Sequence, residues 1–344
     1  MHTCASRPDG LRQRQQMNEF QTIIGRAANP STYPMLMATL VEVQGSSYRR
    51  IGARLMIDRS GGRVGSISGG CLEEDVVARL RQLQERQECF ATAVYDTTTE
   101  NDLVWGVGLG CHSVVRVVLE RWTAPPPWLP AIAQKLRDRQ SPRLWIGWEG
   151  DFRGTHLPSA AAAPANVYVD DIAPPPALLI CGAGDDAIPL TQFAKQLGWT
   201  VHVMDPRPAF ATSERFPLVD TVRVLAPEQI RLAYPFDDRT AAVIMTHHYR
   251  FDRPLLAGLL PLSLPYLGLL GPRQRAVRLL AEVRDLTDAS VSTDPRLHAP
   301  VGLDLGGDGP AAVALAIVAE IQAVLHARNA RPLRDRDRPI HAVC

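Results

Sequence analysis

The feature that most constrains this chain is the short segment Cys181-Gly182-Ala183-Gly184-Asp185-Asp186-Ala187. It follows an apolar run over residues 177–181 and precedes helical spacing over residues 188–197. Gly182 permits a tight turn, Gly184 lets the backbone approach a pyrophosphate, and Ala187 allows the helix to pack closely on a sheet. Asp205 stands about 20 residues further on, where a carboxylate accepts a hydrogen bond from a ribose hydroxyl. Together these features predict a dinucleotide-binding-type α/β domain.

Strand and helix signals alternate downstream of this phosphate loop. Apolar or β-branched runs predict strands over residues 200–205, 220–225, 241–246 and 266–270. Helical spacing predicts helices over residues 273–284 and 311–327, the second with Pro310 at a first-turn position. Alternating strands and helices with short links predict a parallel, Rossmann-like sheet covered on both faces.

Charged side chains near the loop leave two interpretations of its ligand. Asp185 and Asp186 weaken anion binding unless they face away, and Arg207 either favours a 2′-phosphate or pairs with Asp205. A scaffold that no longer binds a dinucleotide is the alternative interpretation. The residues assigned to a nucleotide-type loop are Gly182, Gly184, Asp185, Ala187, Asp205 and Arg207.

Three further residues are candidates for the crevice at the same sheet edge. His247 and His248 follow the predicted strand over residues 241–246 at its carboxyl end, where ligands bind in open α/β sheets. Adjacent side chains point apart on extended backbone, so at most one histidine faces the crevice and a shared metal is not expected. Gly271 follows the next predicted strand and is the third candidate.

The length and two changes in composition predict two domains. A chain of 344 residues is about two domains long. Residues 158–176 are rich in Ala and Pro and predict a linker, and residues 329–344 predict a charged tail. The predicted domains therefore span residues 1–157 and 177–328. In the first, we expect strands over residues 35–43, 53–57 and 113–120 and helices over residues 13–28 and 72–87, which is a mixed α+β domain.

Charge and cysteine content exclude several classes of protein. The 37 basic and 36 acidic side chains nearly cancel, so no global field attracts nucleic acid or an anionic membrane. The polar N-terminus lacks the apolar core of a signal peptide, and the most apolar stretch, residues 254–272, is interrupted by Pro261 and Pro265. Six cysteines without a C-x-x-C pair favour free thiols in a reducing cytosol, so we expect a cytoplasmic protein.

Three glycine-rich segments, residues 45–54, 65–73 and 106–112, carry the chemistry of the first domain. In the second segment, small residues run directly into a predicted helix, so several N–H groups form a nest suited to an anion. We expect Cys71 in the first turn of that helix, where the dipole favours a thiolate, and Glu73 in a position to cap the turn at Gly70. Such a cysteine binds a soft metal centre or carries sulfur; the alternative is a small buried residue. Cys111 closes the third segment, whose glycines suggest close approach to a ligand or to a neighbouring strand.

Three arginines lie in or beside the first glycine-rich segment. Arg49, Arg50 and Arg54 are suited to an oxyanion or phosphate clamp. The alternative is a solvated basic face.

These segments resemble the XdhC/CoxI family, accessory factors for xanthine dehydrogenase and related molybdenum hydroxylases. The likeness runs roughly from residue 20 to residue 328 and is carried by residues 45–47, 52–54, 65–73, 108–111, 180–187, 203–207, 246–249, 268–273, 300–306 and 314–324. Asp185 departs from the histidine that members often have there, and residues 307–309 are less acidic than usual, which bears on nucleotide binding.

The resemblance implies an N-terminal XdhC/CoxI domain followed by a Rossmann-like XdhC domain. It also implies a role, namely to bind molybdenum cofactor while its terminal sulfur ligand is installed and to pass it to an apoenzyme. The residues expected at the cofactor are Ser46, Arg54, Ser68, Gly69, Gly70, Cys71, Glu73 and Cys111, with Cys71 or Cys111 near the metal. The expected partners are a molybdenum hydroxylase apoenzyme, a cysteine desulfurase and a second copy of the chain.

Two other functions compete with this one. The phosphate loop favours an NAD(P)-dependent oxidoreductase, and the second domain alternatively serves as a protein-docking scaffold. No general acid–base pair or Ser-His-Asp set is recognisable in the sequence. The leading hypothesis is therefore a cofactor-binding maturation factor rather than an ordinary enzyme.

Overall fold

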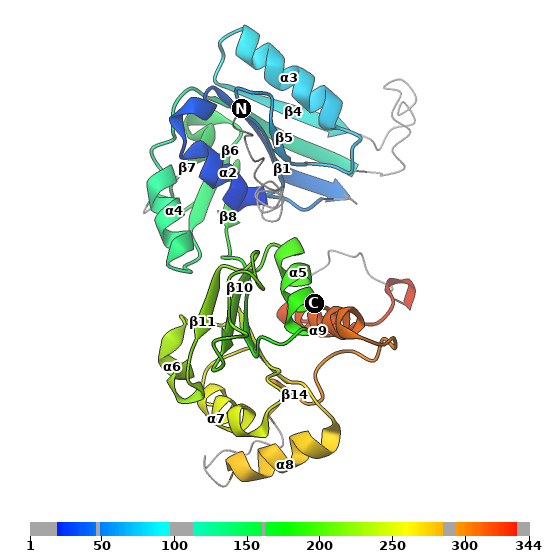
Figure 1. The fold of residues 1–344 in the computed structure, drawn as a ribbon. Coiled ribbons are helices and arrows are strands. Elements are labelled where there is room, and N and C mark those ends of the chain that lie inside the picture. The colour runs from blue at the N-terminus through cyan, green and yellow to red at the C-terminus, as the bar shows by residue number, and fades with distance from the viewer. Residues whose placement is uncertain (1–18, 46–48, 97–112, 160–161, 285–293, 336–344) are drawn as a thin grey trace, which may run out of the picture. The chain divides into compact units, whose positions relative to one another are not determined.

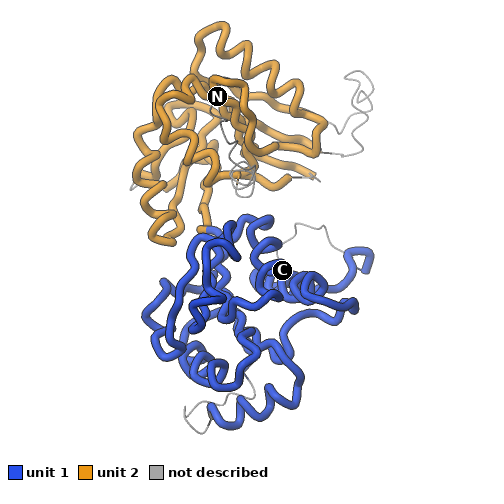
Figure 2. The backbone as a smooth tube through the Cα atoms, viewed as in Figure 1, with its two compact units in different colours: residues 1–17, 175–337, 344 blue, residues 18–174, 338–343 orange. Residues whose placement is uncertain are grey.

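The computed structural model describes residues 19–45, 49–96, 113–159, 162–284 and 294–335 (Figure 1). The chain forms two compact units that meet in sequence between Pro174 and Pro175 (Figure 2). We call them the N-terminal and C-terminal units. Within the described ranges, no helix has both the length and the apolar character needed to cross a bilayer.

A six-stranded sheet organises the C-terminal unit. Its strands lie in the order β11-β10-β9-β12-β13-β14, and all neighbouring pairs are parallel. In chain order this is 3-2-1-4-5-6, the order of doubly wound dinucleotide-binding sheets. The prediction of a parallel Rossmann-like domain is therefore confirmed. The strands are β9 (Ala177–Cys181), β10 (Thr200–Asp205), β11 (Thr221–Val224), β12 (Thr240–Ile244), β13 (Tyr266–Leu269) and β14 (Leu297–His298).

Helices cover both faces of this sheet (Figure 1). One core joins α5 and α9 to the strands, and a second joins α7 and α8 to the opposite face. Because both faces are covered, β9 and β12 are buried at every position, as their unbroken apolar sequences require. The helices are α5 (Ala187–Gln196), α6 (Ile230–Ala233), α7 (Tyr249–Leu259), α8 (Arg273–Arg284) and α9 (Pro310–Leu325).

Two antiparallel sheets build the N-terminal unit. The larger has the order β3-β2-β1-β5-β4 and the smaller the order β7-β6-β8. The strands of the larger sheet are β1 (Met35–Gly45), β2 (Arg54–Ile57), β3 (Arg63–Gly65), β4 (Phe90–Asp96) and β5 (Ser113–Trp122). Those of the smaller are β6 (Arg143–Gly147), β7 (Gly154–His156) and β8 (Val167–Asp171). The expected mixed α+β character is confirmed.

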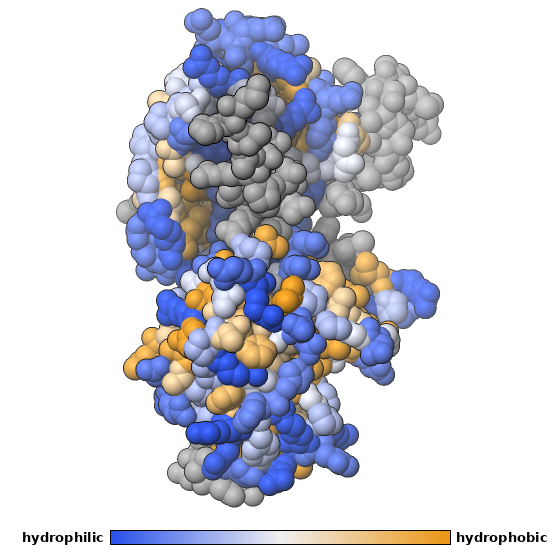
Figure 3. Space-filling model, in the orientation of Figure 1, coloured by the Kyte–Doolittle hydropathy of each residue, from blue (hydrophilic) through white to orange (hydrophobic). Residues whose placement is uncertain are grey.

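Strand β1 separates two cores of the N-terminal unit. Met35 and Met37 pack with α2 (Glu19–Ala27) and α4 (Leu129–Arg137), whereas Leu36 and Ala38 pack with α3 (Glu73–Glu85). Successive side chains of a strand point to opposite faces, so a strand buried on both sides is apolar at consecutive positions. The surface over α3 is hydrophilic in the view of Figure 3, as expected for a helix that buries only one face.

The structure differs from the predicted linker over residues 158–176. Residues 167–171 of that segment form β8, which pairs with β6 along its whole length, and the change between units falls at residue 174. The short run Val167-Tyr168-Val169 has the β-branched and aromatic residues typical of a strand but lies next to Ala- and Pro-rich sequence, which obscured it. Helix α4 and strands β6 and β7 were also not predicted.

Candidate functional site

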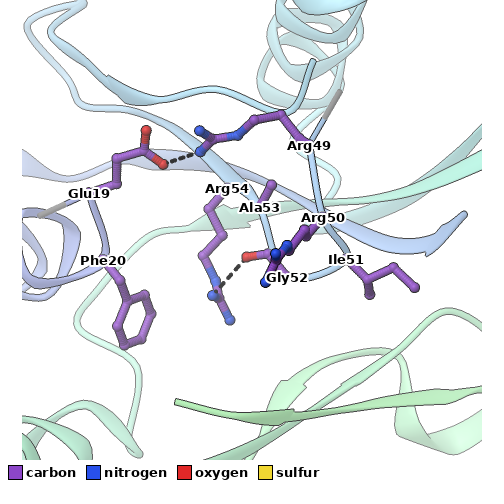
Figure 4. Close-up of a pocket in the computed structure, with 8 residues that line it drawn as sticks. All are labelled: Glu19, Phe20, Arg49, Arg50, Ile51, Gly52, Ala53 and Arg54. Atoms are coloured by element: carbon purple, nitrogen blue, oxygen red, sulfur yellow. Dashed lines mark hydrogen bonds and ion pairs between the residues drawn. The ribbon is translucent and has the colours of Figure 1, made fainter. Parts of the chain in front are cut away.

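An arginine-lined pocket of about 380 Å³ lies in the N-terminal unit (Figure 4). Small-molecule sites commonly fall between about 300 and 1,000 Å³. Residues 49–53 and Arg54 at the start of β2 supply most of the wall, and the start of α2 supplies the rest. The lining residues are Glu19, Phe20, Arg49, Arg50, Ile51, Gly52, Ala53 and Arg54. The structure thus brings the three predicted clamp arginines to one cavity.

Arg54 is the fixed member of the three arginines. Its side chain is only 10% exposed and donates to an Asp170 carboxylate oxygen at 2.6 Å. It also donates to the Gly52 carbonyl at 3.1 Å and lies over the Phe20 ring, 4.6 Å from its centroid. A buried guanidinium needs such partners because water cannot solvate it. Arg54 therefore shapes the pocket rather than being free to move within it.

Arg49 is the more accessible member. It forms an ion pair with Glu19, and both side chains are partly exposed, at 29% and 40%. Figure 4 shows the contact between Glu19 and Arg49, with Arg50 next to Arg49 on the same segment. Glu19, Phe20 and Asp170 were not predicted as site residues, because they are distant in sequence from the arginines they contact.

The second glycine-rich segment folds around the carboxylate of Glu73. The Glu73 side chain accepts from the N–H groups of Ile67, Ser68 and Gly70, at 3.2, 2.8 and 3.0 Å, and from the Ser68 hydroxyl. Burial raises the pKa of Glu73, but the hydrogen bonds from Ser68 and the backbone outweigh it, so the pKa lies below its ordinary value. The predicted contact between Glu73 and the Gly70 N–H is present, but it closes a turn before α3 and does not cap the helix. The predicted nest exists, and the protein's own carboxylate occupies it.

Cys71 lies on the exposed rim of this loop. Helix α3 begins at Glu73, so the expectation that Cys71 falls in the first helical turn is wrong. The reason is that the Glu73 carboxylate gathers the N–H groups of Ile67, Ser68 and Gly70 into a turn that ends before the helix starts. Cys71 is exposed, which excludes the alternative of a small buried residue. Gly69 and Gly70 are exposed beside it, whereas Ser68 is buried.

Gly65 lies beside two residues of the pocket and leads in sequence into the Cys71 loop. A Cβ atom at Gly65 would overlap the Arg54 carbonyl oxygen and would lie 3.5 Å from a Glu19 carboxylate oxygen. Gly65 pairs with Leu55 in the β2–β3 ladder, and the Cys71 loop begins at the next residue. Two predicted cofactor residues, Ser46 and Cys111, lie outside the described residues.

The second unit holds the phosphate loop in the predicted conformation. Gly182 has a φ of +124°, and a Cβ atom there would lie 2.5 Å from the Met245 backbone. Only glycine fits such a close approach of the backbone. A Cβ atom at Gly184 would meet nothing within 4 Å, and Ala187 is fully buried at the start of α5.

Asp205 is engaged within the protein instead of facing a ligand. It is fully buried and accepts from the Ala183 N–H at 2.8 Å and from the Arg207 N–H and guanidinium. Burial raises the pKa of Asp205, but these hydrogen bonds lower it below its ordinary value. Of the two roles considered for Arg207, pairing with Asp205 is the one observed. A ribose hydroxyl would have to displace that pair.

The two acidic residues of the phosphate loop are also paired. Asp185 contacts Arg215 at 2.8 Å, and Asp186 contacts the Nε2 of His247 at 2.9 Å. Both pairs place carboxylates beside the N-terminus of α5, where a dinucleotide would place its phosphates.

The two crevice histidines have different partners, but His247 has a φ of +58° and does not lie on the extended backbone that the prediction assumed. His247 points to the loop, whereas the ring of His248 lies 4.7 Å from that of Phe251. Gly271 follows β13 with a φ of +133° and lies against Arg275. No group of three or more His, Cys, Asp or Glu side chains suited to a metal ion occurs in the part of the chain that the structure describes.

Comparisons with known proteins agree with this two-unit organisation. The XdhC and CoxI family model matches residues 31–96, and the XdhC Rossmann domain model matches residues 178–321. The chain is 33% identical to a probable xanthine dehydrogenase component of Bacillus subtilis (strain 168), over 89% of this chain and 97% of the relative. It is 22% identical to the molybdenum cofactor insertion chaperone PaoD of Escherichia coli (strain K12), over 84% of this chain and 83% of the relative.

A solved structure is also similar. The crystal structure of a xanthine dehydrogenase from Bacillus halodurans matches with a TM-score of 0.77 and 28% identity, over 92% of this chain and 99% of that chain. The Bacillus subtilis relative is similar over nearly its whole length, and both family models match in the expected order. The chain therefore belongs to the XdhC and CoxI family.

Proposed function

We propose that this protein is an accessory factor that binds molybdenum cofactor and delivers it to a molybdenum hydroxylase of the xanthine dehydrogenase type. The observation that carries the proposal is an arginine-lined pocket beside Gly65, the residue from which the chain continues into the loop that exposes Cys71. Family membership and the similarity to an insertion chaperone support the same role.

The chemistry of the two neighbouring features fits this cargo. Molybdenum cofactor is a phosphorylated pterin that holds an oxidised metal through soft sulfur ligands. Arginine is suited to phosphate through charge-assisted, bidentate hydrogen bonds, and a cysteine sulfur is suited to a soft metal centre. Glu73 holds the loop through hydrogen bonds to the Ser68 and Gly70 N–H groups, so Cys71 is carried on a hydrogen-bonded support. A cysteine desulfurase that supplies the terminal sulfur ligand and a homodimeric assembly are further parts of the proposal.

Two exposed cysteines make a matched test. We would purify the protein from cells that make molybdenum cofactor and measure released pterin and molybdenum. Cys71→Ser is expected to lower both strongly and to reduce the activity of the hydroxylase made in the same cells. Cys89→Ser, which also removes an exposed thiol of the N-terminal unit, is expected to change neither. The proposal fails if the wild-type protein carries neither pterin nor metal and the hydroxylase matures normally with Cys71→Ser.

The competing functions lack an observation that favours them. An NAD(P)-dependent oxidoreductase needs a ribose acceptor, and the Asp205 carboxylate is buried and bonded to Arg207. A pure docking scaffold would support hydroxylase maturation equally well with Ser at position 71. The same cysteine experiment therefore separates it from the leading proposal.

A further inference from the structure

The three pocket arginines differ in how firmly the protein holds them. Arg54 is buried, forms an ion pair with Asp170 and donates a hydrogen bond to the Gly52 carbonyl. Moving its side chain would break the ion pair and leave the buried Asp170 carboxylate without its counter-charge. Arg49 and Glu19 are partly exposed, and water and salt weaken an ion pair of that kind. Arg50 is exposed on the same turn. An incoming anion therefore meets one buried cation, Arg54, and two that are more accessible to solvent.

The acidic partner of Arg49 is itself part of the pocket wall. Glu19 is the first residue of α2, and its carboxylate lies against Gly65 as well as against Arg49. The described lining holds three arginines and one glutamate, and Asp170 adds a second carboxylate through its pair with Arg54, so three cations stand against two carboxylates. A carboxylate paired with an arginine occupies the donors that a phosphate would use, because both anions accept from the planar guanidinium fork.

We propose that the pocket binds a phosphate ester, with Arg49 and Arg50 as direct ligands, Arg54 as a positioning residue and Glu19 as an internal competitor. In the unliganded protein Glu19 holds Arg49. A phosphate dianion, which offers more charge and more acceptor oxygens than a carboxylate, takes over the guanidinium and releases Glu19. This deepens the proposed function and rests on it, since the ester would be the phosphate of the bound cofactor.

Removing the charge of Arg49 and removing the charge of Glu19 are expected to change the affinity for a phosphate ester in opposite directions. Arg49→Gln and Arg50→Gln each remove charge-assisted hydrogen bonds and are expected to weaken binding about tenfold or more. Glu19→Gln keeps the size of the side chain but removes the competing charge, so it is expected to tighten binding several-fold. A side chain that merely maintained the fold would not strengthen binding when its charge is removed.

The test is calorimetric titration of the full chain with glycerol 3-phosphate, inorganic phosphate and inorganic pyrophosphate. Arg79→Gln is the matched control, because Arg79 also pairs with a carboxylate, that of Asp75, but lies on α3 and not in the pocket. We expect Arg79→Gln to bind as the wild type does. Thermal unfolding of each variant confirms that it is folded.

Several outcomes would overturn the inference. It fails if glycerol 3-phosphate does not bind, if Arg49→Gln and Arg50→Gln bind it normally, or if Glu19→Gln weakens binding. Binding of inorganic phosphate without the ester would also overturn it, because a site for the free anion would then be present. These failures are distinct from failure of the proposed function, which is measured by pterin and molybdenum released from the purified protein.

Discussion

The hydrogen bonds by which Glu73 supports the Cys71 loop predict a large loss of stability for a single substitution, Glu73→Ala. The change removes the acceptor for the N–H groups of Ile67, Ser68 and Gly70 and for the Ser68 hydroxyl. Hydrogen bonds to a charged group contribute about 1.5–3 kcal/mol each when buried, but Gly70 is exposed and water replaces part of the loss. We therefore expect the free energy of unfolding of the N-terminal unit to fall by about 3 kcal/mol.

Two measurements check this value. In a domain of this size, about 3 kcal/mol lowers the unfolding midpoint by roughly 6–12 °C, which calorimetry resolves. The loop would also open in the folded state, so the reaction of Cys71 with a thiol reagent should change in rate while that of Cys89 does not. Glu74→Ala is the control, because Glu74 is exposed on the same helical turn, and we expect a change within about 0.5 kcal/mol. Equal midpoints for the two variants would refute the reasoning.

Three further predictions concern the C-terminal unit. Gly182→Ala should destabilise it by about 2–4 kcal/mol in urea unfolding, since a Cβ atom would overlap the Met245 backbone at positive φ; a fully stable variant would contradict the structure. Titration with NAD(H) and NADP(H) to millimolar levels should give no binding heat, because Asp205 is already paired; clear binding would restore the oxidoreductase. Glu320→Gln should lower stability at neutral pH and weaken the loss of stability in acid. Burial raises the pKa of Glu320, but hydrogen bonds from His298 and Tyr266 lower it below its ordinary value of 4.5. The ionised carboxylate therefore contributes to the free energy of unfolding above that pH, and this contribution is lost as the pH falls through the folded-state pKa. The same loss of stability below neutral pH in Glu320→Gln and in the wild type would rule out this role.

Local patterns in the sequence predict the C-terminal sheet well. Five apolar residues before Gly182 indicate a buried strand, and an acid about 20 residues later indicates the end of the next strand. The structure has β9, the loop and β10 at these places. The pairing of Asp205 with Arg207, two residues away, was foreseen as one of two alternatives for the same reason. The family model for this region agrees.

The pocket was only half predictable. Its arginines cluster in sequence. Phe20 and Asp170, however, are 34 and 116 residues away from Arg54, and no local sequence pattern indicates that they contact it. The error over the start of α3 has a similar cause. Glycines followed by helical spacing resemble a helix start, and only the reach of the Glu73 side chain shows where the turn ends.

The pair between Arg54 and Asp170 determines where this polypeptide can be divided. Asp170 belongs to β8, close to the junction at residue 174, so a fragment stopped at residue 157 would lack it. Its Arg54 would then be a nearly buried cation with no counter-charge, a defect that costs about 3–5 kcal/mol. An autonomous N-terminal fragment should therefore extend through β8. A protease that cuts between β7 and β8 should leave two pieces that remain associated.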